Sequence, residues 1–445
     1  MLRTTSESTP QRWFILIACS VAMLAIANLQ YAWTLFTTDL TRSLHARLDA
    51  VQWTLTFFII AQTVLFPINA YFVDRFGPRV VVTLASFFVA VGWIGAGLAN
   101  SLPALYVSYA LGGIGAGAVY GGSVGVAMKW FPDRRGLCVG IVAGSYGFGT
   151  ALTALPIDHM IKSSGYRSAF ITFGIIQGIV VLLAAQFIQM PVAGWLPAGW
   201  EAIKARVQRK VVQSECDCTP REMLRSGSFY LLYLMMTLVT ASGLMLSAQL
   251  KPIAVSYGYD KYALFAGFTV LTFTLSLNQV LNGSARPFFG WVSDRIGRYD
   301  TMAIVFVMEA IAIVALTLVV ARPFWFIVTS ALMFFAWGDI YSLFPAAIAD
   351  IFGNRHATTN YGIQYTAKGL GSILAGPGAA LLMSAAGSWV PVFWTAVACN
   401  VIAAGLAVVW LKPRVERMIR EQTTEPANID KEVAAWSISA TATEE

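Results

Sequence analysis

Two basic residues, Arg286 and Lys368, stand inside long apolar stretches of this sequence. Arg286 precedes Asp294 by eight residues, which is about 12 Å of helix, and half the hydrocarbon thickness of a bilayer is about 15 Å. A guanidinium at this depth keeps its proton and can form paired hydrogen bonds with a carboxylate. Arg286 therefore indicates an anion-binding group near the centre of a membrane. The alternative is a structural ion pair that stabilises its helix.

Lys368 reaches a similar depth, because it follows Arg355 by thirteen residues, or at most about 20 Å of helix. Neighbouring Gly369, Gly371 and Gly376 would let another helix or a ligand approach closely. Two cations at one depth repel each other unless a negative group lies between them. Together, the two residues predict a binding site for a small organic anion.

Aromatic residues and one glutamine can complete such a site, because a membrane-embedded tyrosine hydroxyl needs a partner and a carboxylate oxygen is a suitable acceptor. Trp337 and Tyr341 are four residues apart and share a helix face, and Tyr365 and Lys368, three apart, do the same. The candidate lining residues are Gln30, Tyr31, Tyr120, Tyr146, Trp337, Tyr341 and Tyr365.

The competing interpretation of these aromatic residues is helix packing or the aromatic belt at a membrane surface. Depth argues against the belt for Tyr120, Tyr146 and Tyr341. Both interpretations stay open for Tyr31 and Trp33, which lie toward the outer end of the first apolar block.

Asp339 adds a carboxyl group at the same depth, eleven residues or about 16 Å before Asp350. Three interpretations stay open. The carboxylate could pair with Lys368 or Arg286, which would lower the charge of the site and favour a monocarboxylate. It could carry a coupled proton. It could also be a structural partner that faces a neighbouring helix, since it lies about 200° around the helix from Trp337.

Membrane-spanning helices would have to position these residues. The chain has 445 residues, of which 57% are hydrophobic and 12% charged, whereas a soluble domain carries about 25% charged residues. Continuous, non-alternating apolar blocks favour helices over a barrel. The first block has spanning length and no cleavage pattern, so it is predicted to be a helix rather than a signal peptide. The twelve blocks are 13–36, 52–73, 80–99, 103–128, 136–158, 168–190, 228–250, 263–291, 300–320, 324–349, 359–386 and 390–411.

The net charge of +7 is distributed as membrane topology predicts and does not indicate nucleic-acid binding. With both termini inside, the inner segments hold 21 Lys and Arg residues and the outer segments hold seven. This asymmetry follows the positive-inside rule. The lipid bilayer is therefore the expected environment, with both termini in the cytoplasm.

The sequence shows no nucleophile and base arrangement, phosphate loop or metal-ligand cluster. Cys216 and Cys218 are separated by one residue, which is not the usual spacing of a zinc site. We therefore expect neither an enzyme nor a metal or other cofactor.

The chain divides into two similar halves. Residues 71–79, YFVDRFGPR, recur as GWVSDRIGR at 290–298, and an offset of 220 places Asp74 on Asp294. An offset of 222 places Tyr146 on Lys368. Such repeats are typical of secondary transporters, whose site lies between the halves. The predicted domains are an N-terminal six-helix half at 1–190, a cytoplasmic loop at 191–227, a C-terminal six-helix half at 228–411 and a cytoplasmic tail at 412–445.

Asp-Arg-x-Gly in both repeats resembles the signature of the major facilitator superfamily, and further segments resemble its oxalate:formate antiporter family. They are QYAWTLF at 30–36, VYGG and KWFPDRRG at 119–136, GSYGFG at 144–149, NGSARPFFGWVSDRIGRY at 282–299, FFAWGDIYSLFP at 334–345, DIFG at 350–353 and NYGIQYTAKG at 360–369. The resemblance implies an all-α membrane protein, with twelve transmembrane helices in two pseudo-symmetric halves, that exchanges oxalate for formate by alternating access.

The same resemblance implies roles for individual residues. The residues matching Arg286 and Lys368 bind the two ends of oxalate, and Tyr31, Tyr120, Tyr146, Trp337 and Tyr341 match lining aromatics. Two positions depart from the family pattern: the antiporter has Trp at Tyr365 and Gly at Asp339. The charged residues of the repeats would control the conformation at the inner helix ends, and they are Asp74, Arg75, Arg79, Asp294, Arg295 and Arg298.

Two other functions remain to be weighed. A proton-coupled symporter of a monocarboxylate such as lactate or formate would use Asp339 as the coupling group. A non-transporting membrane sensor would need a soluble output domain, and the tail of about thirty residues is too short for one. The expected protein is a monomer in a bacterial inner membrane. The sequence leaves open which carboxylate is carried, the stoichiometry and the direction of flux.

Overall fold

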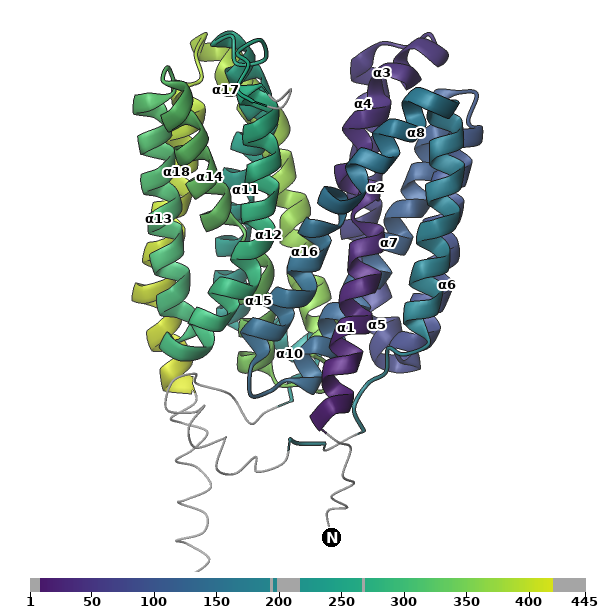
Figure 1. Ribbon diagram of the computed structural model, residues 1–445. Coiled ribbons are helices and arrows are strands. Elements are labelled where there is room, and N and C mark those ends of the chain that lie inside the picture. Colours follow the sequence, from purple (N-terminus) through teal and green to yellow (C-terminus); the bar gives the residue numbers. More distant parts are fainter. Residues whose placement is uncertain (1–8, 193–194, 198–216, 266–268, 419–445) are drawn as a thin grey trace, which may run out of the picture.

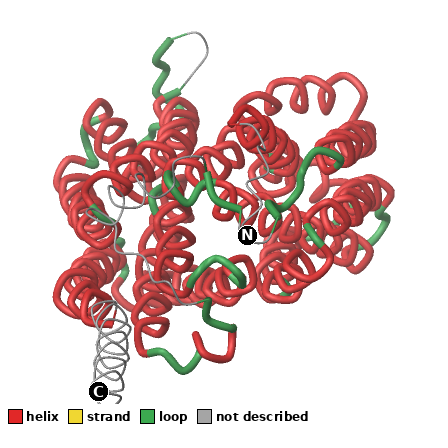
Figure 2. Tube along the Cα trace, turned by 90° about the horizontal axis from the view of Figure 1, so that it is seen from below, coloured by secondary structure: helices red, strands yellow, loops and turns green. Residues whose placement is uncertain are grey.

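The computed structural model describes residues 9–192, 195–197, 217–265 and 269–418. Within these ranges the chain is helical, and the only β feature is a bridge between Ala263 and Thr269. Figure 1 shows two helical bundles that converge at the end where the N-terminus lies and diverge at the other end. Figure 2, seen along the helices from that end, separates the same two groups. The predicted all-α, two-half architecture is confirmed.

The first bundle contains the helices of the N-terminal half. They are α1 (Thr9–Ile26), α2 (Asn28–Tyr31), α3 (Trp33–Ser43), α4 (Leu48–Val64), α5 (Phe66–Phe76), α6 (Pro78–Leu98), α7 (Leu102–Trp130) and α8 (Arg135–Ala185).

The second bundle contains the helices of the C-terminal half, preceded by the short α10 (Pro220–Met223). They are α11 (Gly227–Ser256), α12 (Val270–Ile296), α13 (Arg298–Val319), α14 (Pro323–Trp337), α15 (Ile340–Phe352), α16 (Ala357–Ile373), η1 (Leu374–Gly378), α17 (Ala379–Ala386), α18 (Val390–Gly405) and η2 (Leu406–Leu411).

Several predicted spans are interrupted helices. Helices α4 and α5 are bent by 44°, where Pro67 lies in the first turn of the second helix and cannot continue the hydrogen bonding of the first. The predicted spans 136–158 and 168–190 fall in α8, which consists of two helices joined at a kink where Gly165 has a non-helical φ of +82°, a conformation that favours glycine. Gly338 and Asp339 separate α14 from α15. The kink at Gly165 lies in the gap between two predicted blocks, whereas the other two breaks fall inside blocks and were not visible as gaps in apolarity.

Among the described residues, nine helices are long and apolar enough to cross a membrane, or ten if α4 and α5 count as one bent span. The predicted blocks 263–291 and 359–386 lie on helices outside this set. These are α12 and α16 with α17, and they carry Arg286 and Lys368. Their polar residues lower their apolarity. Two of the twelve predicted spans are therefore less apolar than the rest, and these two contain Arg286 and Lys368, the residues that predicted the site.

The predicted loop at 191–227 and tail at 412–445 lie largely outside the described residues. What the structure describes of the loop includes α10, which begins with a capping box between Thr219 and Glu222. The backbone N–H and hydroxyl of Thr219 donate to the Glu222 carboxylate and lower its pKa. Cys216 is outside the described residues, and Cys218 is half-buried.

The two halves meet along two crossings related by the internal repeat. Helix α12 packs on α8, and α16 packs on α5. A Cβ on Gly140 of α8 would lie 2.3 Å from the Arg286 carbonyl oxygen, and one on Gly362 of α16 would lie 3.1 Å from Pro67 Cα. The glycines thus allow close helix contact at both crossings. The repeat that aligns Arg286-Pro287 with Phe66-Pro67 therefore places each pair at an equivalent crossing.

Candidate functional site

Arg286 lies on α12 at the contact between the two halves and is only 1% exposed. One guanidinium nitrogen, Nη1, donates to the backbone carbonyl of Ala143 on α8 at 2.6 Å. The other, Nη2, donates to Asn282 Oδ1 at 2.9 Å. No carboxylate of the described residues forms an ion pair with Arg286. Arg286 is thus held in place by neutral acceptors, and its charge is not neutralised.

Lys368 lies on α16 and is 4% exposed. Its Nζ donates to the Tyr365 hydroxyl at 3.0 Å, one helical turn away, as the sequence spacing predicted. Like Arg286, it takes part in no ion pair within the described ranges. A second buried cation therefore also lacks a negative partner.

Tyr341 on α15 brings the two cations together. Its ring centroid lies 4.6 Å from Arg286 Cζ and 5.7 Å from Lys368 Nζ. An aromatic ring attracts cations to its face without neutralising them. The structure thus gathers Arg286, Lys368 and Tyr341, from three helices, into one group, here called the central cluster.

Aromatic residues of the N-terminal half face this cluster. The Tyr146 hydroxyl donates to Gln30 Oε1 at 2.9 Å, and Gln62 Nε2 lies 3.4 Å from the same hydroxyl. The ring of Tyr146 lies 5.3 Å from that of Tyr31 and 5.6 Å from that of Tyr120. Gln30, Tyr31, Tyr120 and Tyr146 are therefore brought together as one wall.

This wall meets the C-terminal half through Tyr365. The Tyr365 ring lies 5.3 Å from that of Tyr120 and stacks on Phe66 at 4.5 Å. Trp337 lies at the edge of the group, 6.2 Å from the Tyr341 ring, and packs closely over Gly243 of α11. All seven predicted lining residues are thus connected by ring contacts or hydrogen bonds to the group that holds the two cations. Whether they contact a substrate stays a prediction.

The sequence interpretation missed four residues of this region: Gln62, Phe66, Asn282 and Tyr361. Phe66 was within reach of sequence reasoning, because the repeat aligns it with Arg286. Gln62 and Asn282 are polar residues inside apolar blocks, and both are at most 2% exposed. Such polar interruptions in a spanning helix could have identified them.

Several donors in this region have no hydrogen-bond acceptor among the described residues. They are Arg286 Nε, the hydroxyls of Tyr120 and Tyr361, and the indole nitrogen of Trp337. Unsatisfied buried donors are costly. A ligand rich in acceptor oxygens would satisfy them, and a carboxylate offers two such oxygens.

Asp339 is fully buried at the break between α14 and α15, and neither of its carboxylate oxygens has a partner among the described residues. It forms no ion pair with Arg286 or Lys368. Helix α13, which carries the buried Glu309, packs on α14 and α15. In this conformation its carboxylate therefore does not offset the charge of the central cluster.

A second group of charges closes the end of the bundles where the N-terminus lies. Asp74, at the end of α5, accepts from the Thr359 backbone N–H at 2.9 Å and from its hydroxyl at 2.6 Å. It also pairs with Lys129 at 2.7 Å, whose Nζ donates to the Arg355 carbonyl. A carboxylate at the N-terminus of a helix, here α16, is favourable. Asp74 thus joins the two halves.

Asp294, at the end of α12, makes the equivalent contact across the other crossing. It accepts from the backbone N–H groups of Gly136 and Leu137 at 3.0 and 2.9 Å, at the N-terminus of α8. The offset of 222 aligns Leu137 with Thr359. Each repeat therefore supplies an aspartate that caps a helix of the opposite half.

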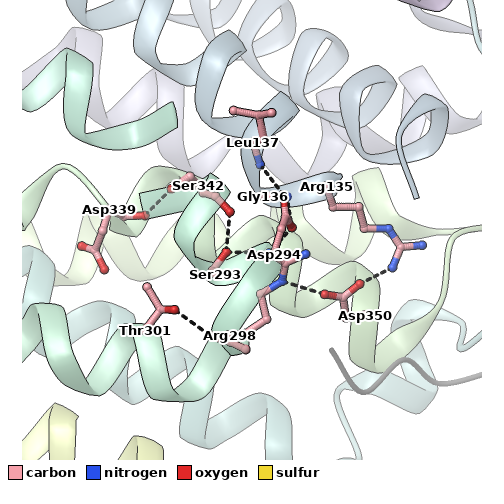
Figure 3. Close-up of polar contacts among 12 residues, drawn as sticks. Arg135, Gly136, Leu137, Ser293, Asp294, Arg298, Thr301, Asp339, Ser342 and Asp350 are labelled. Carbon is pink, nitrogen blue, oxygen red and sulfur yellow. Dashed lines mark hydrogen bonds and ion pairs between the residues drawn. The ribbon is translucent and has the colours of Figure 1, made fainter. Parts of the chain in front are cut away.

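Asp350 of α15 completes this network, because both of its oxygens bind arginines (Figure 3). Arg298 Nε donates to one oxygen at 2.8 Å, while Arg298 Nη1 binds Asp294 at 2.6 Å. Arg135 of the other half pairs with the second oxygen. We call the residues Asp74, Lys129, Arg135, Asp294, Arg298, Asp350 and Thr359 the latch.

The predicted gating residues divide into two groups. Asp74, Asp294 and Arg298 belong to the latch. Arg75 and Arg295 are exposed and contact Tyr71 and Trp291 of their own helices, and exposed Arg79 binds the Gln186 carbonyl within its own half. The latch partners Arg135 and Asp350 were not predicted, although both lie in segments that resemble the family, at 129–136 and 350–353.

Two repeated helical bundles, a pair of unneutralised cations between them and a latch at one end define a membrane carrier. The chain matches the family model described as Major Facilitator Superfamily at residues 18–375 and 267–441. It is also 37% identical, over 94% of its length and 96% of the relative's, to the oxalate:formate antiporter of Oxalobacter formigenes. This chain belongs to the major facilitator superfamily and, within it, to the oxalate:formate antiporter family.

Solved structures show the same fold at low sequence identity. The proton:xylose symporter XylE superposes with a TM-score of 0.72 at 13% identity, covering 91% of this chain and 96% of that one. The fucose:proton symporter FucP of E. coli gives 0.63 at 13% identity, covering 88% and 97%. The likeness extends over both halves of this chain, so the major facilitator fold is confirmed.

Proposed function

We propose that this protein exchanges oxalate for formate across a membrane by alternating access. The observation that carries the proposal is the pair of buried cations, Arg286 and Lys368, which share the ring of Tyr341 and have no carboxylate partner among the described residues. A dianion with a carboxylate at each end would neutralise both. The 37% identical relative is an oxalate:formate antiporter, which agrees with this substrate.

The two cations would bind in different ways. The guanidinium of Arg286 offers two parallel donors to one carboxylate. The ammonium of Lys368 acts as a point charge toward the other. Asp339 does not pair with either cation, so the site keeps two positive charges. This charge favours oxalate over a lactate-like monocarboxylate and does not support the proton-coupled symporter.

An empty site would leave two cations facing each other in a medium of low dielectric constant. Closing the halves around such a site is unfavourable, whereas closing them around an anion is not. We therefore expect obligatory exchange rather than uniport. The latch would hold one conformation of the cycle, and its opening would expose the central cluster to the latch side.

The sidedness follows from charge. The latch lies at the end that carries the N-terminus (Figure 1), and the basic residues of the chain concentrate in the segments assigned to that side. We propose that this side is the cytoplasm of a bacterium, that the protein resides in the inner membrane, and that it works as a monomer.

Counterflow in liposomes tests the proposal. Purified protein is reconstituted into vesicles loaded with unlabelled oxalate, formate or lactate, and uptake of labelled oxalate is measured. We expect rapid uptake against oxalate or formate, slow uptake against lactate and almost none against an empty lumen. Arg286→Gln and Lys368→Gln should abolish the difference in oxalate uptake between loaded and empty vesicles. Arg322→Gln, at an exposed arginine, should leave this difference unchanged. Normal exchange by both central variants would overturn the assignment, and equal uptake into empty and loaded vesicles would overturn obligatory exchange.

A further inference from the structure

The C-terminal half contains a second polar cluster that shares no residue with the central cluster or the latch. Glu309 of α13 and Asp339, between α14 and α15, are both fully buried. Neither forms an ion pair with a Lys, Arg or His residue of the described chain, and α13, which carries Glu309, packs on α14 and α15, the two helices that Asp339 separates. Two buried acids without a cation are unusual, because an isolated buried carboxylate is very costly.

One uncharged side chain binds Glu309 directly, and a second binds the first. Ser242 of α11 donates its hydroxyl proton to Glu309 Oε1 at 3.0 Å. Asn400 of α18 donates from Nδ2 to Ser242 Oγ at 2.7 Å and to the Ala396 carbonyl at 3.3 Å. These bonds use every donor that Ser242 and Asn400 possess. The cluster is therefore built from helices α11, α13 and α18 together with the α14–α15 break.

Counting hydrogen-bond groups shows what the cluster lacks. Four acceptor oxygens have no donor among the described residues: Glu309 Oε2, both oxygens of Asp339 and Asn400 Oδ1. The Asn400 oxygen is independent evidence that the cluster lacks a donor, because it belongs to a neutral, fully buried side chain. A proton on either acid would remove one negative charge and turn one of these acceptors into a donor.

We propose that Glu309 and Asp339 form a proton-binding site, separate from the central cluster, that carries at least one proton at neutral pH. The proton comes from solvent and bonds to a carboxylate oxygen, so the pair changes from two negative charges to one or none.

The surroundings of the pair favour a proton over a fixed counter-ion. Helix α18 packs on α13, and its one titratable residue is Cys399. Arg286 of α12 donates instead to Ala143 and Asn282. On α15, Tyr341 packs against the central cations, and α14 has no titratable residue. No basic group of the described residues is thus available to neutralise the acids.

The position of Asp339 links this site to the central cluster. A Cβ on the preceding Gly338 would lie 2.5 Å from the Asn282 carbonyl oxygen. Asn282 in turn donates to the Phe334 carbonyl of α14 at 3.1 Å and accepts from Arg286. A change of charge on Asp339 would act on the break between α14 and α15, which contacts Asn282. We therefore expect anion binding at the central cluster and proton binding at Glu309 and Asp339 to influence each other.

Infrared difference spectroscopy of the purified full chain in lipid tests the proposal without any substrate. We expect a carbonyl band of a protonated carboxylic acid at neutral pH that decreases as the pH is raised and shifts when the protein is moved to D2O. The band should be lost in the variant carrying both Glu309→Gln and Asp339→Asn, and reduced in each single variant. It should be unchanged in Asp158→Asn, whose carboxylate pairs with Lys162 at the surface. Oxalate should shift the band in the wild-type protein.

Three results would overturn the proposal. Absence of the band from the wild-type protein would exclude a proton at this site, and this measurement needs no variant. Persistence of the band in a folded double variant would assign it to another acid. If the band is absent and sodium, but not choline, raises the Tm of the protein, the site binds Na⁺ instead of a proton. A band that oxalate leaves unchanged would overturn only the proposed link to the central cluster. Because the band is measured without anion, none of the first three results bears on oxalate exchange.

Discussion

The latch and the central cluster both bury charged residues between the halves, but they treat the charges in opposite ways. In the latch, the carboxylates of Asp74, Asp294 and Asp350 each meet a basic side chain or a helix N-terminus. In the central cluster, Arg286 and Lys368 meet only carbonyls, hydroxyls and an aromatic ring. A buried ion pair that is already complete can hold a conformation. A buried cation without a partner is prepared for an anion that the chain does not supply.

The internal repeat explains how one backbone serves both purposes. The aspartates at the ends of α5 and α12 and the glycines at the crossings keep equivalent positions in the two halves. At the centre the repeat has diverged, because Arg286 aligns with Phe66 and Lys368 with Tyr146. Each crossing thus contributes one cation and one aromatic residue. Symmetry is retained where the halves must close and is lost where the ligand must be recognised.

The largest effect is expected in the latch, from Asp350→Asn. This change leaves Arg135 and Arg298 buried without their shared carboxylate, and breaking a buried pair costs about 3–5 kcal/mol. The conformation closed at the latch should lose stability, which can be measured as increased labelling of a cysteine introduced on the latch side. Asp300→Asn, in a half-exposed pair with Lys412, serves as the control. Unchanged labelling would mean that the latch does not hold the halves.

The next largest effect is expected from Arg286→Gln. Removing one partner of a charged, hydrogen-bonded contact with a carboxylate costs about 3 kcal/mol, or about a hundredfold in oxalate affinity. Equilibrium binding of labelled oxalate would measure it. If binding falls but thermal stability stays within a few degrees of the wild type, the loss belongs to the ligand contact. A variant that unfolds instead would assign Arg286 the structural role that the sequence left open.

A smaller and more selective effect is expected from Lys368→Gln. An ammonium that contributes one charge-assisted bond is worth about 1.5–3 kcal/mol, so oxalate affinity should fall about tenfold or more. Formate has one carboxylate and should lose less. The ratio of oxalate to formate affinity is therefore the informative measurement, with Lys162→Gln, at an exposed lysine, as control. An equal loss for both anions would argue that Lys368 does not contact the second carboxylate.

The smallest effect is expected from Tyr341→Leu, which removes the ring that both cations share. A cation–π contact is worth about 0.5–2 kcal/mol, so oxalate affinity should fall a few-fold. Tyr341→Phe keeps the ring and should bind nearly as well as the wild type. If the phenylalanine variant instead loses as much as the leucine variant, the hydroxyl rather than the ring of Tyr341 is what matters.

Sequence alone predicted the elements that depend on local composition. Each of the twelve apolar blocks overlaps a helix of the described chain, and helix geometry was sufficient to place Arg286 and Lys368 in the buried interior. The repeat also predicted that Asp74 and Asp294 would be equivalent. These features depend on periodicity and spacing, which a single sequence records directly.

Contacts between distant helices were not predictable in the same way. Nothing in the spacing of Arg135 and Asp350, 215 residues apart, shows that they pair. Glu309 escaped notice because a single acid in an apolar block has no visible partner, and it is the fold that brings it near Asp339. Of the three interpretations of Asp339, the structure does not show the ion pair with a central cation. The interpretation of Asp339 as a proton-carrying group is kept, but the proton is now proposed to be shared with Glu309.

A double-mutant cycle on Arg286 and Lys368 tests most directly the claim that these two cations share one dianion. Oxalate and formate affinities would be measured for the wild type, Arg286→Gln, Lys368→Gln and the double variant. If each cation holds one end of oxalate, the double variant should lose much less than the two single losses combined, because the second carboxylate cannot bind well once the first is released. Formate should show almost no such coupling. Additive losses for oxalate, or the same coupling for both anions, would contradict the claim.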